Sequence, residues 1–222
     1  MASKNGRNLA NVTDQAGFYL QASMMVMKKV TTAAIEGYKS LLSIDKGSQT
    51  RYYRDKGIGH TKKGKFAQAV ALLEKAHAED PNDQDVVFYL GVAFIKTGQA
   101  GKGISMLEQG YKLDKSNSKL ASVLGMAYIQ EKDYKKAAAT LDEACKNDKR
   151  NYNIHYRLGL AYDNLKEYKK AIKAFEGALE IKPDAANVHQ SLGFAHEQNG
   201  DHEAAVQCFK KSLEIEEAGK QG

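Results

Sequence analysis

Residues 152–185 read YNIHYRLGLAYDNLKEYKKAIKAFEGALEIKPDA, and this stretch decides the fold. A Leu-Gly pair stands at Leu158 and Gly159. An aromatic residue follows the glycine by three positions, a small residue by twelve, a large apolar residue by sixteen and another small residue by nineteen. Residues three or four apart share one face of an α-helix. The spacing therefore predicts two amphipathic helices that pack closely where their small residues meet.

The same spacing recurs every 34 residues, in the blocks 50–83, 84–117, 118–151, 152–185 and 186–219. A fixed period of this length is typical of stacked helical hairpins, each of which buries its apolar face only against its neighbours. The pattern resembles the tetratricopeptide repeat. That resemblance implies an all-α, right-handed superhelical solenoid of five hairpins. The glycines that define the period are Gly57, Gly91, Gly125, Gly159 and Gly193.

Residues 1–49 depart from the period. We expect a disordered start followed by a degenerate N-terminal repeat, because a frame over 15–48 places apolar and small residues in the repeat slots but lacks the Leu-Gly pair. Such a segment leaves apolar side chains to bury. We expect it to drive self-assembly by docking in the groove of a neighbouring copy; the alternative is that it packs on its own first repeat. Its candidate contact residues are Phe18, Met25, Tyr38 and Leu41.

Composition narrows the class of protein. The chain carries a net charge of +6, but its lysines alternate with acidic residues and form no long basic run, so we expect no nucleic-acid site. The most apolar stretch, 18–27, is shorter than the roughly 20 residues that span a bilayer. We therefore expect a cytoplasmic protein that meets a membrane only peripherally. Cys145 and Cys208 follow no disulfide spacing and are expected to stay reduced.

Motifs for catalysis are missing from the sequence. It has no phosphate-binding Gly-Lys-Ser/Thr loop, no Gly-x-Gly-x-x-Gly fingerprint and no Gly-x-Ser-x-Gly elbow, so we expect no enzyme and no cofactor. The six histidines allow a metal site as an alternative. However, His60 and His196 occupy the slot of Phe94, Tyr128 and Tyr162 in other blocks, which favours packing roles over metal ligation.

The first helix of each block is expected to line a groove with an apolar floor and polar rims. This composition suits an amphipathic helix or an extended peptide. The alternative is that some of the apolar residues only pack against one another. The candidate partner-binding residues are Arg51, Arg54, Ile58, Phe88, Val92, Ile95, Met126, Ile129, Tyr156, Asp163, Asn164 and Phe194.

A closer resemblance rests on Tyr53-Arg-Asp-Lys-Gly-Ile58 with His60, and on Arg157-Leu-Gly-Leu-Ala161. These stretches are similar to the MamA family, magnetosome-associated proteins of magnetotactic bacteria. The resemblance implies a scaffold that forms homo-oligomers and recruits other magnetosome proteins at the cytoplasmic face of the magnetosome membrane.

The resemblance also implies a division of the repeats into halves, 50–151 and 152–219, with a tail at 220–222. It further implies that the N-terminal segment binds in the groove of a neighbouring copy. A monomeric peptide-binding adaptor, of the co-chaperone or secretion type, is the alternative function. The missing carboxylate clamp of chaperone-binding arrays counts against the chaperone version.

The packing role of the histidines generates a first prediction. Dialysis against a chelator should leave both the circular dichroism spectrum and the self-association of the protein unchanged. A loss of either that added zinc or iron restores would instead identify the histidines as metal ligands.

Overall fold

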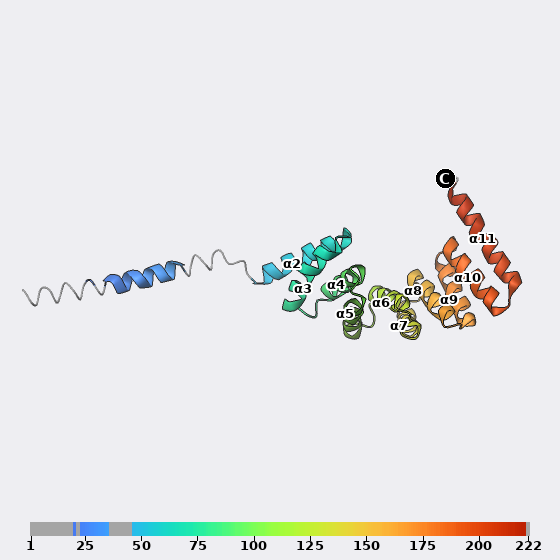
Figure 1. The fold of residues 1–222 in the computed structure, drawn as a ribbon, viewed down its shortest axis with the longest axis horizontal. Helices are drawn as coiled ribbons and strands as arrows, with labels where there is room; N and C mark the ends of the chain where they lie inside the picture. Colours follow the sequence, from blue (N-terminus) through green and yellow to red (C-terminus); the bar gives the residue numbers. More distant parts are fainter. Residues whose placement is uncertain (1–19, 21–22, 36–45, 221–222) are drawn as a thin grey trace, which may run out of the picture. The chain divides into compact units, whose positions relative to one another are not determined.

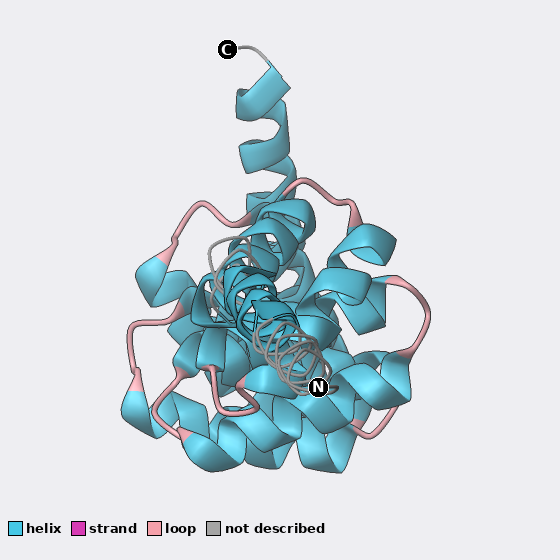
Figure 2. Cartoon of the chain, turned by 90° about the vertical axis from the view of Figure 1, so that its left-hand side faces the viewer, coloured by secondary structure: helices cyan, strands magenta, loops and turns pink. Residues whose placement is uncertain are grey.

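The computed structural model describes residues 20, 23–35 and 46–220. All the regular structure in these ranges is α-helical, and short loops join the helices (Figures 1 and 2). The labelled helices are α2 (Lys46–Lys62), α3 (Phe66–Glu79), α4 (Gln84–Lys96), α5 (Ala100–Leu113), α6 (Ser118–Gln130), α7 (Tyr134–Asn147), α8 (Tyr152–Asn164), α9 (Tyr168–Ile181), α10 (Ala186–Asn199) and α11 (His202–Lys220).

These helices form the five predicted hairpins. Helices α4, α6, α8 and α10 begin at the first residues of their 34-residue blocks, whereas α2 begins at Lys46, four residues before its block. Each of the second helices α3, α5, α7 and α9 packs against the first helix of the following repeat. The all-α solenoid expected from the sequence is confirmed.

The chain divides into two compact units, Met1–Gln49 and Thr50–Gly222. Within the first unit, residues 23–35 form a helix whose side chains are all exposed, including Met25. Phe18, Tyr38 and Leu41 of the expected self-assembly segment lie outside the described residues.

The starts of three first helices are fixed by side chains at the same position of the repeat. Asp83, Asn117 and Asn151 stand 34 residues apart, and each accepts a hydrogen bond from the backbone N–H three residues later. Such caps satisfy a backbone donor that lacks a partner within the helix. The fourth position holds Ala185, which cannot cap in this way.

The turn inside each hairpin also follows the period. Gly64, Gly98 and Gly200 have positive φ angles of 72°, 80° and 88°, and the same slot holds Lys132 and Lys166 with φ of 61°. The left-handed conformation suits glycine and is less favourable for residues with a Cβ atom. The backbone geometry of the turn is therefore kept even where the side chain disfavours it.

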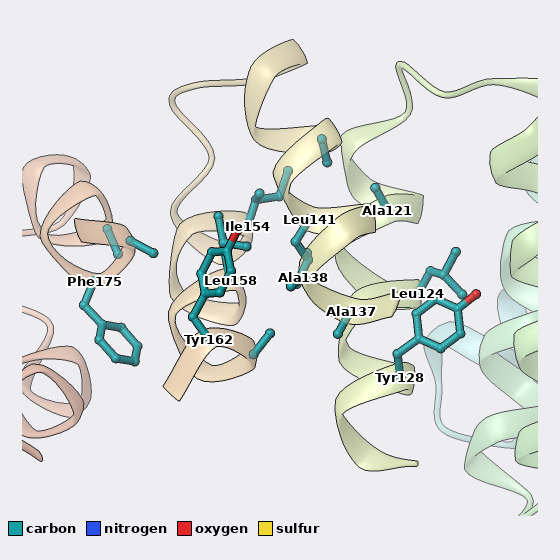
Figure 3. Close-up of a cluster of buried hydrophobic side chains, with 14 of the residues drawn as sticks. Ala121, Leu124, Tyr128, Ala137, Ala138, Leu141, Ile154, Leu158, Tyr162 and Phe175 are labelled. Atoms are coloured by element: carbon teal, nitrogen blue, oxygen red, sulfur yellow. The ribbon is translucent and has the colours of Figure 1, made fainter. Parts of the chain in front are cut away.

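The two helices of every hairpin cross at the predicted glycine. A Cβ atom added to Gly159 would lie 2.4 Å from ring carbons of Phe175, a residue with no exposed surface. The other four repeats make the same contact at 2.5–2.8 Å. Figure 3 shows Phe175 beside the helix that carries Leu158 and Tyr162. The glycine is thus required because the facing side chain occupies the place of its Cβ atom.

A second contact ties consecutive repeats. The hydroxyl of Tyr128 donates a hydrogen bond to Glu108, and that of Tyr162 donates to Asp142, both at 2.5 Å. The donors and the acceptors are each 34 residues apart, so the first helix of one repeat is held to the second helix of the repeat before it. Burial, followed by these hydrogen bonds, raises the pKa of both phenols.

The glycine contact generates a stability prediction with a matched control. Gly159→Ala should lower the free energy of unfolding by about 1–3 kcal/mol, because the new methyl group overpacks the core against Phe175. Gly101→Ala, within α5 where nothing lies within 4 Å of the added Cβ, should raise stability by up to about 1 kcal/mol. Urea unfolding followed by circular dichroism measures both; equal effects would contradict the packing role of Gly159.

Candidate protein-binding groove

Three first helices enclose a hollow between them. Helix α6 contacts both α4 and α8, and a cavity of about 190 Å³ opens where they meet. Its floor is apolar, and its rim carries an amide and two cations. We call it the α4–α6–α8 hollow; it is lined by Val92, Ile95, Lys96, Val123, Met126, Ala127, Gln130 and Arg157. The structure thus brings Val92, Ile95 and Met126, three of the predicted groove residues, together in one place.

Arg157 is the charged group of this hollow that sequence reasoning missed. Its guanidinium Nη1 donates to the backbone oxygen of Ser122 at 2.5 Å and to the Ser122 hydroxyl at 2.6 Å. Burial lowers the pKa of Arg157. No acidic side chain of the described residues forms an ion pair with it. A partly desolvated cation beside an apolar floor favours a ligand that brings a carboxylate.

Arg54 has a different environment from the one expected. Its Nε lies 2.7 Å from Asp83 and its Nη2 lies 2.6 Å from Asp85, while Nη1 lies 3.1 Å from Asp55. Burial lowers the pKa of Arg54, but the hydrogen bonds and negative charges of these carboxylates outweigh that effect. The pKa of Arg54 is therefore raised. The Arg54 side chain therefore links α2 to the start of α4, and its place in a partner-binding groove stays a prediction.

Phe88, another predicted groove residue, is largely buried. It is 8% exposed and belongs to the hydrophobic core, and the ammonium group of Lys119 lies 4.3 Å from the centre of its ring. The ring is thus covered from the side of the next first helix. Phe88 therefore contributes to the junction between repeats.

The remaining predicted residues fall into two groups. Ile58, Ile129, Tyr156 and Asp163 are half-buried, and the ring of Tyr156 stacks on Tyr152 with centroids 6.1 Å apart. Desolvation raises the pKa of Asp163. Three others are exposed outside the hollow: Arg51, Asn164 and Phe194.

The histidines and cysteines form no metal site among the residues that the structure describes. The Sγ atom of Cys145 lies 3.5 Å from Nε2 of His155, and that nitrogen lies 2.9 Å from the backbone oxygen of Lys149. Both cysteines are free thiols. Burial raises the pKa of each thiol, which disfavours the reactive thiolate. No helix in the described part of the chain is long and apolar enough to cross a membrane.

Comparison with known proteins agrees with this architecture. Two tetratricopeptide-repeat family models match the chain, one at residues 60–127 and the other at 122–186 and 156–220. Tetratricopeptide repeats are modules for binding other proteins. The magnetosome protein MamA of Paramagnetospirillum magnetotacticum is 36% identical over 82 residues, and that of Magnetospirillum gryphiswaldense is 35% identical over 82. These alignments cover 37% of this chain and only 38% of each relative.

Solved structures extend the similarity over more of the chain. A MamA structure from strain MSR-1 superposes with a TM-score of 0.70 at 38% identity, covering 77% of this chain and 98% of that one. A MamA structure from strain AMB-1 gives 0.71 at 41% identity, covering 75% and 99%. With nearly the whole of these structures matched at such identity, the chain belongs to the MamA family of tetratricopeptide-repeat proteins.

Proposed function

We propose that this protein is a non-enzymatic scaffold that assembles with copies of itself and recruits partner proteins at the cytoplasmic face of the magnetosome membrane. The observation that carries the proposal is the α4–α6–α8 hollow, where an apolar floor meets Arg157, a cation that pairs with no carboxylate of the described residues. Grooves of this kind bind helices or extended segments through a few apolar anchors. The magnetosome location rests on the relatives, which are named magnetosome proteins.

The occupant that we propose for the hollow is the N-terminal segment of a neighbouring copy. The side chains of the described helix at 23–35 are all exposed, and Met24, Met27 and Ile35 are 55–65% exposed. In the sequence, Ile35 is followed by the carboxylate of Glu36. An apolar side chain next to a carboxylate is the chemistry that the floor and Arg157 favour.

Such a contact joins two different surfaces of the same chain. A head-to-tail contact does not have to close, so it can produce large assemblies. Association with the membrane is then peripheral, through partner proteins or through the many copies that one assembly presents together. A monomeric adaptor would use the same hollow for an external peptide, and the state of assembly separates the two functions.

A truncation tests the role of the N-terminal segment. Deleting residues 1–45 should give a folded protein that is mainly monomeric, because α2–α11 contain the core and the deleted residues contain the proposed ligand. Size-exclusion chromatography with light scattering measures the mass. If the truncated protein remains a large oligomer, the N-terminal segment is not the assembly contact; if the full-length protein is itself monomeric, the adaptor function is favoured.

A pair of substitutions tests the hollow. Met126→Glu places a charge on the half-buried apolar floor and should weaken assembly at least about tenfold. Ala139→Glu adds the same charge at an exposed position of α7, outside the hollow, and should leave assembly within about threefold of wild type. Sedimentation velocity over a dilution series gives the affinities, and thermal unfolding checks that both variants stay folded. Equal affinities for the two variants would exclude the floor as the contact.

A further inference from the structure

The last hairpin carries a second apolar surface, away from the hollow. Phe194 of α10 is 54% exposed, and Val206 and Leu213 of α11 are 65% and 60% exposed. The ring of Phe194 packs edge-on against Phe209, with centroids 5.0 Å apart. We call this surface the end face, defined by Phe194, Val206, Phe209 and Leu213. Single exposed apolar residues are common on proteins, so exposure alone does not identify a binding site.

Val206 and Leu213 occupy positions of the repeat that are buried or half-buried in earlier hairpins. Val206 and Leu213 stand 34 residues after Ile172 and Leu179, which are half-buried and pack on the main hydrophobic core. Two repeats earlier than these, the same slots hold Ile104, half-buried on the core, and Tyr111, which is 8% exposed. The last hairpin thus keeps the apolar side chains that other hairpins use between repeats.

The helix contacts explain the difference in exposure. Helices α5, α7 and α9 each lie against two first helices, that of their own repeat and that of the next. Among the described helices, α11 contacts α10 and no other (Figure 1). Helix α11 is also longer, with 19 residues where α9 has 14. The end face therefore has the slots of an interface that is formed within the stack, and no further helix of the described residues covers it.

The charges around α11 indicate which class of partner the end face favours. Between residues 197 and 217 the sequence holds six carboxylates and two lysines, an excess of four negative charges in a chain whose net charge is +6. Lys211 pairs with Glu214 at 3.6 Å and His202 with Glu197 at 2.8 Å. The acidic residues of α11 without an ion pair among the described residues are Glu203, Glu216 and Glu217.

We propose that the end face binds a basic amphipathic helix of a partner protein, in the position that the first helix of a sixth repeat would occupy. The apolar stripe of this helix covers Val206, Leu213 and Phe194, and its lysines or arginines pair with the free carboxylates of α11. The proposal rests on the scaffold function and names the class of partner. Since self-assembly uses the hollow, every copy in an assembly keeps its end face free for recruitment.

Two synthetic peptides of about 18 residues, long enough to form a helix on binding, test the proposal. Both carry the same leucine stripe, and their polar faces are lysine in one and glutamate in the other. Fluorescence anisotropy with the full-length protein should show the lysine peptide binding at least about tenfold more tightly than the glutamate peptide. Comparable affinity of the two peptides would overturn the assignment of a basic partner.

The double variant Val206→Glu with Leu213→Glu separates docking from charge attraction. Docking on the apolar stripe predicts at least about tenfold weaker binding of the lysine peptide, although the variant is more acidic than wild type. General attraction to an acidic surface predicts tighter binding and would overturn the proposal. Gln207→Glu, an exposed position on the same helix, is the matched control and should not weaken binding.

Measurements of assembly mass and of peptide binding distinguish a failure of this proposal from a failure of the scaffold function. The double variant should assemble to the same mass as wild type in light scattering, because the hollow is untouched. A variant that no longer assembles would show that the end face joins copies of this chain, and the partner proposal would be wrong. If the wild-type protein is monomeric but still binds the lysine peptide at the end face, self-assembly is rejected and the end-face proposal stands.

Discussion

The contact between a glycine of the first helix and a large apolar side chain of the second is the constraint on which the structure depends. It occurs in all five hairpins, and in each the facing side chain fills the place where a Cβ atom would stand. Close approach of the helices lets the surrounding alanines pack at the density of a protein interior. It also sets the separation of helices in one repeat, and so the spacing at which the next repeat can stack. The tyrosine–carboxylate bonds and the capping residues then add to a geometry that this contact has fixed.

The period made the fold predictable, because each structural position is sampled five times along the chain. The small residues, the hairpin boundaries and most of the turns could all be located in this way. The groove was less predictable. Arg54, Phe88 and Ser122 share one slot of the repeat, and the structure turns each of them toward a charged residue on the next first helix.

Contacts of this kind join residues 31–35 positions apart, so they are invisible when each block is considered by itself. A search for opposite charges about one period apart would have found Asp85 as the partner of Arg54. Arg157 carries a weaker signal, because its partner in the structure is the neutral Ser122. Side chains that form such junction contacts are not available to a ligand. Which side chains are used in this way depends on their geometry, and the sequence does not give that geometry.

A stack of this kind has consequences for how the molecule opens. Among the described helices, each hairpin contacts its neighbouring hairpins only, so α6–α7 is held from two sides and α10–α11 from one. The free energy needed to open a hairpin locally is therefore lower at α10–α11 than at α6–α7. Backbone amides of the last hairpin then exchange with solvent by local fraying, long before the array unfolds. A helix bound on that side adds the missing second interface, which couples ligand occupancy to the rigidity of the end of the array.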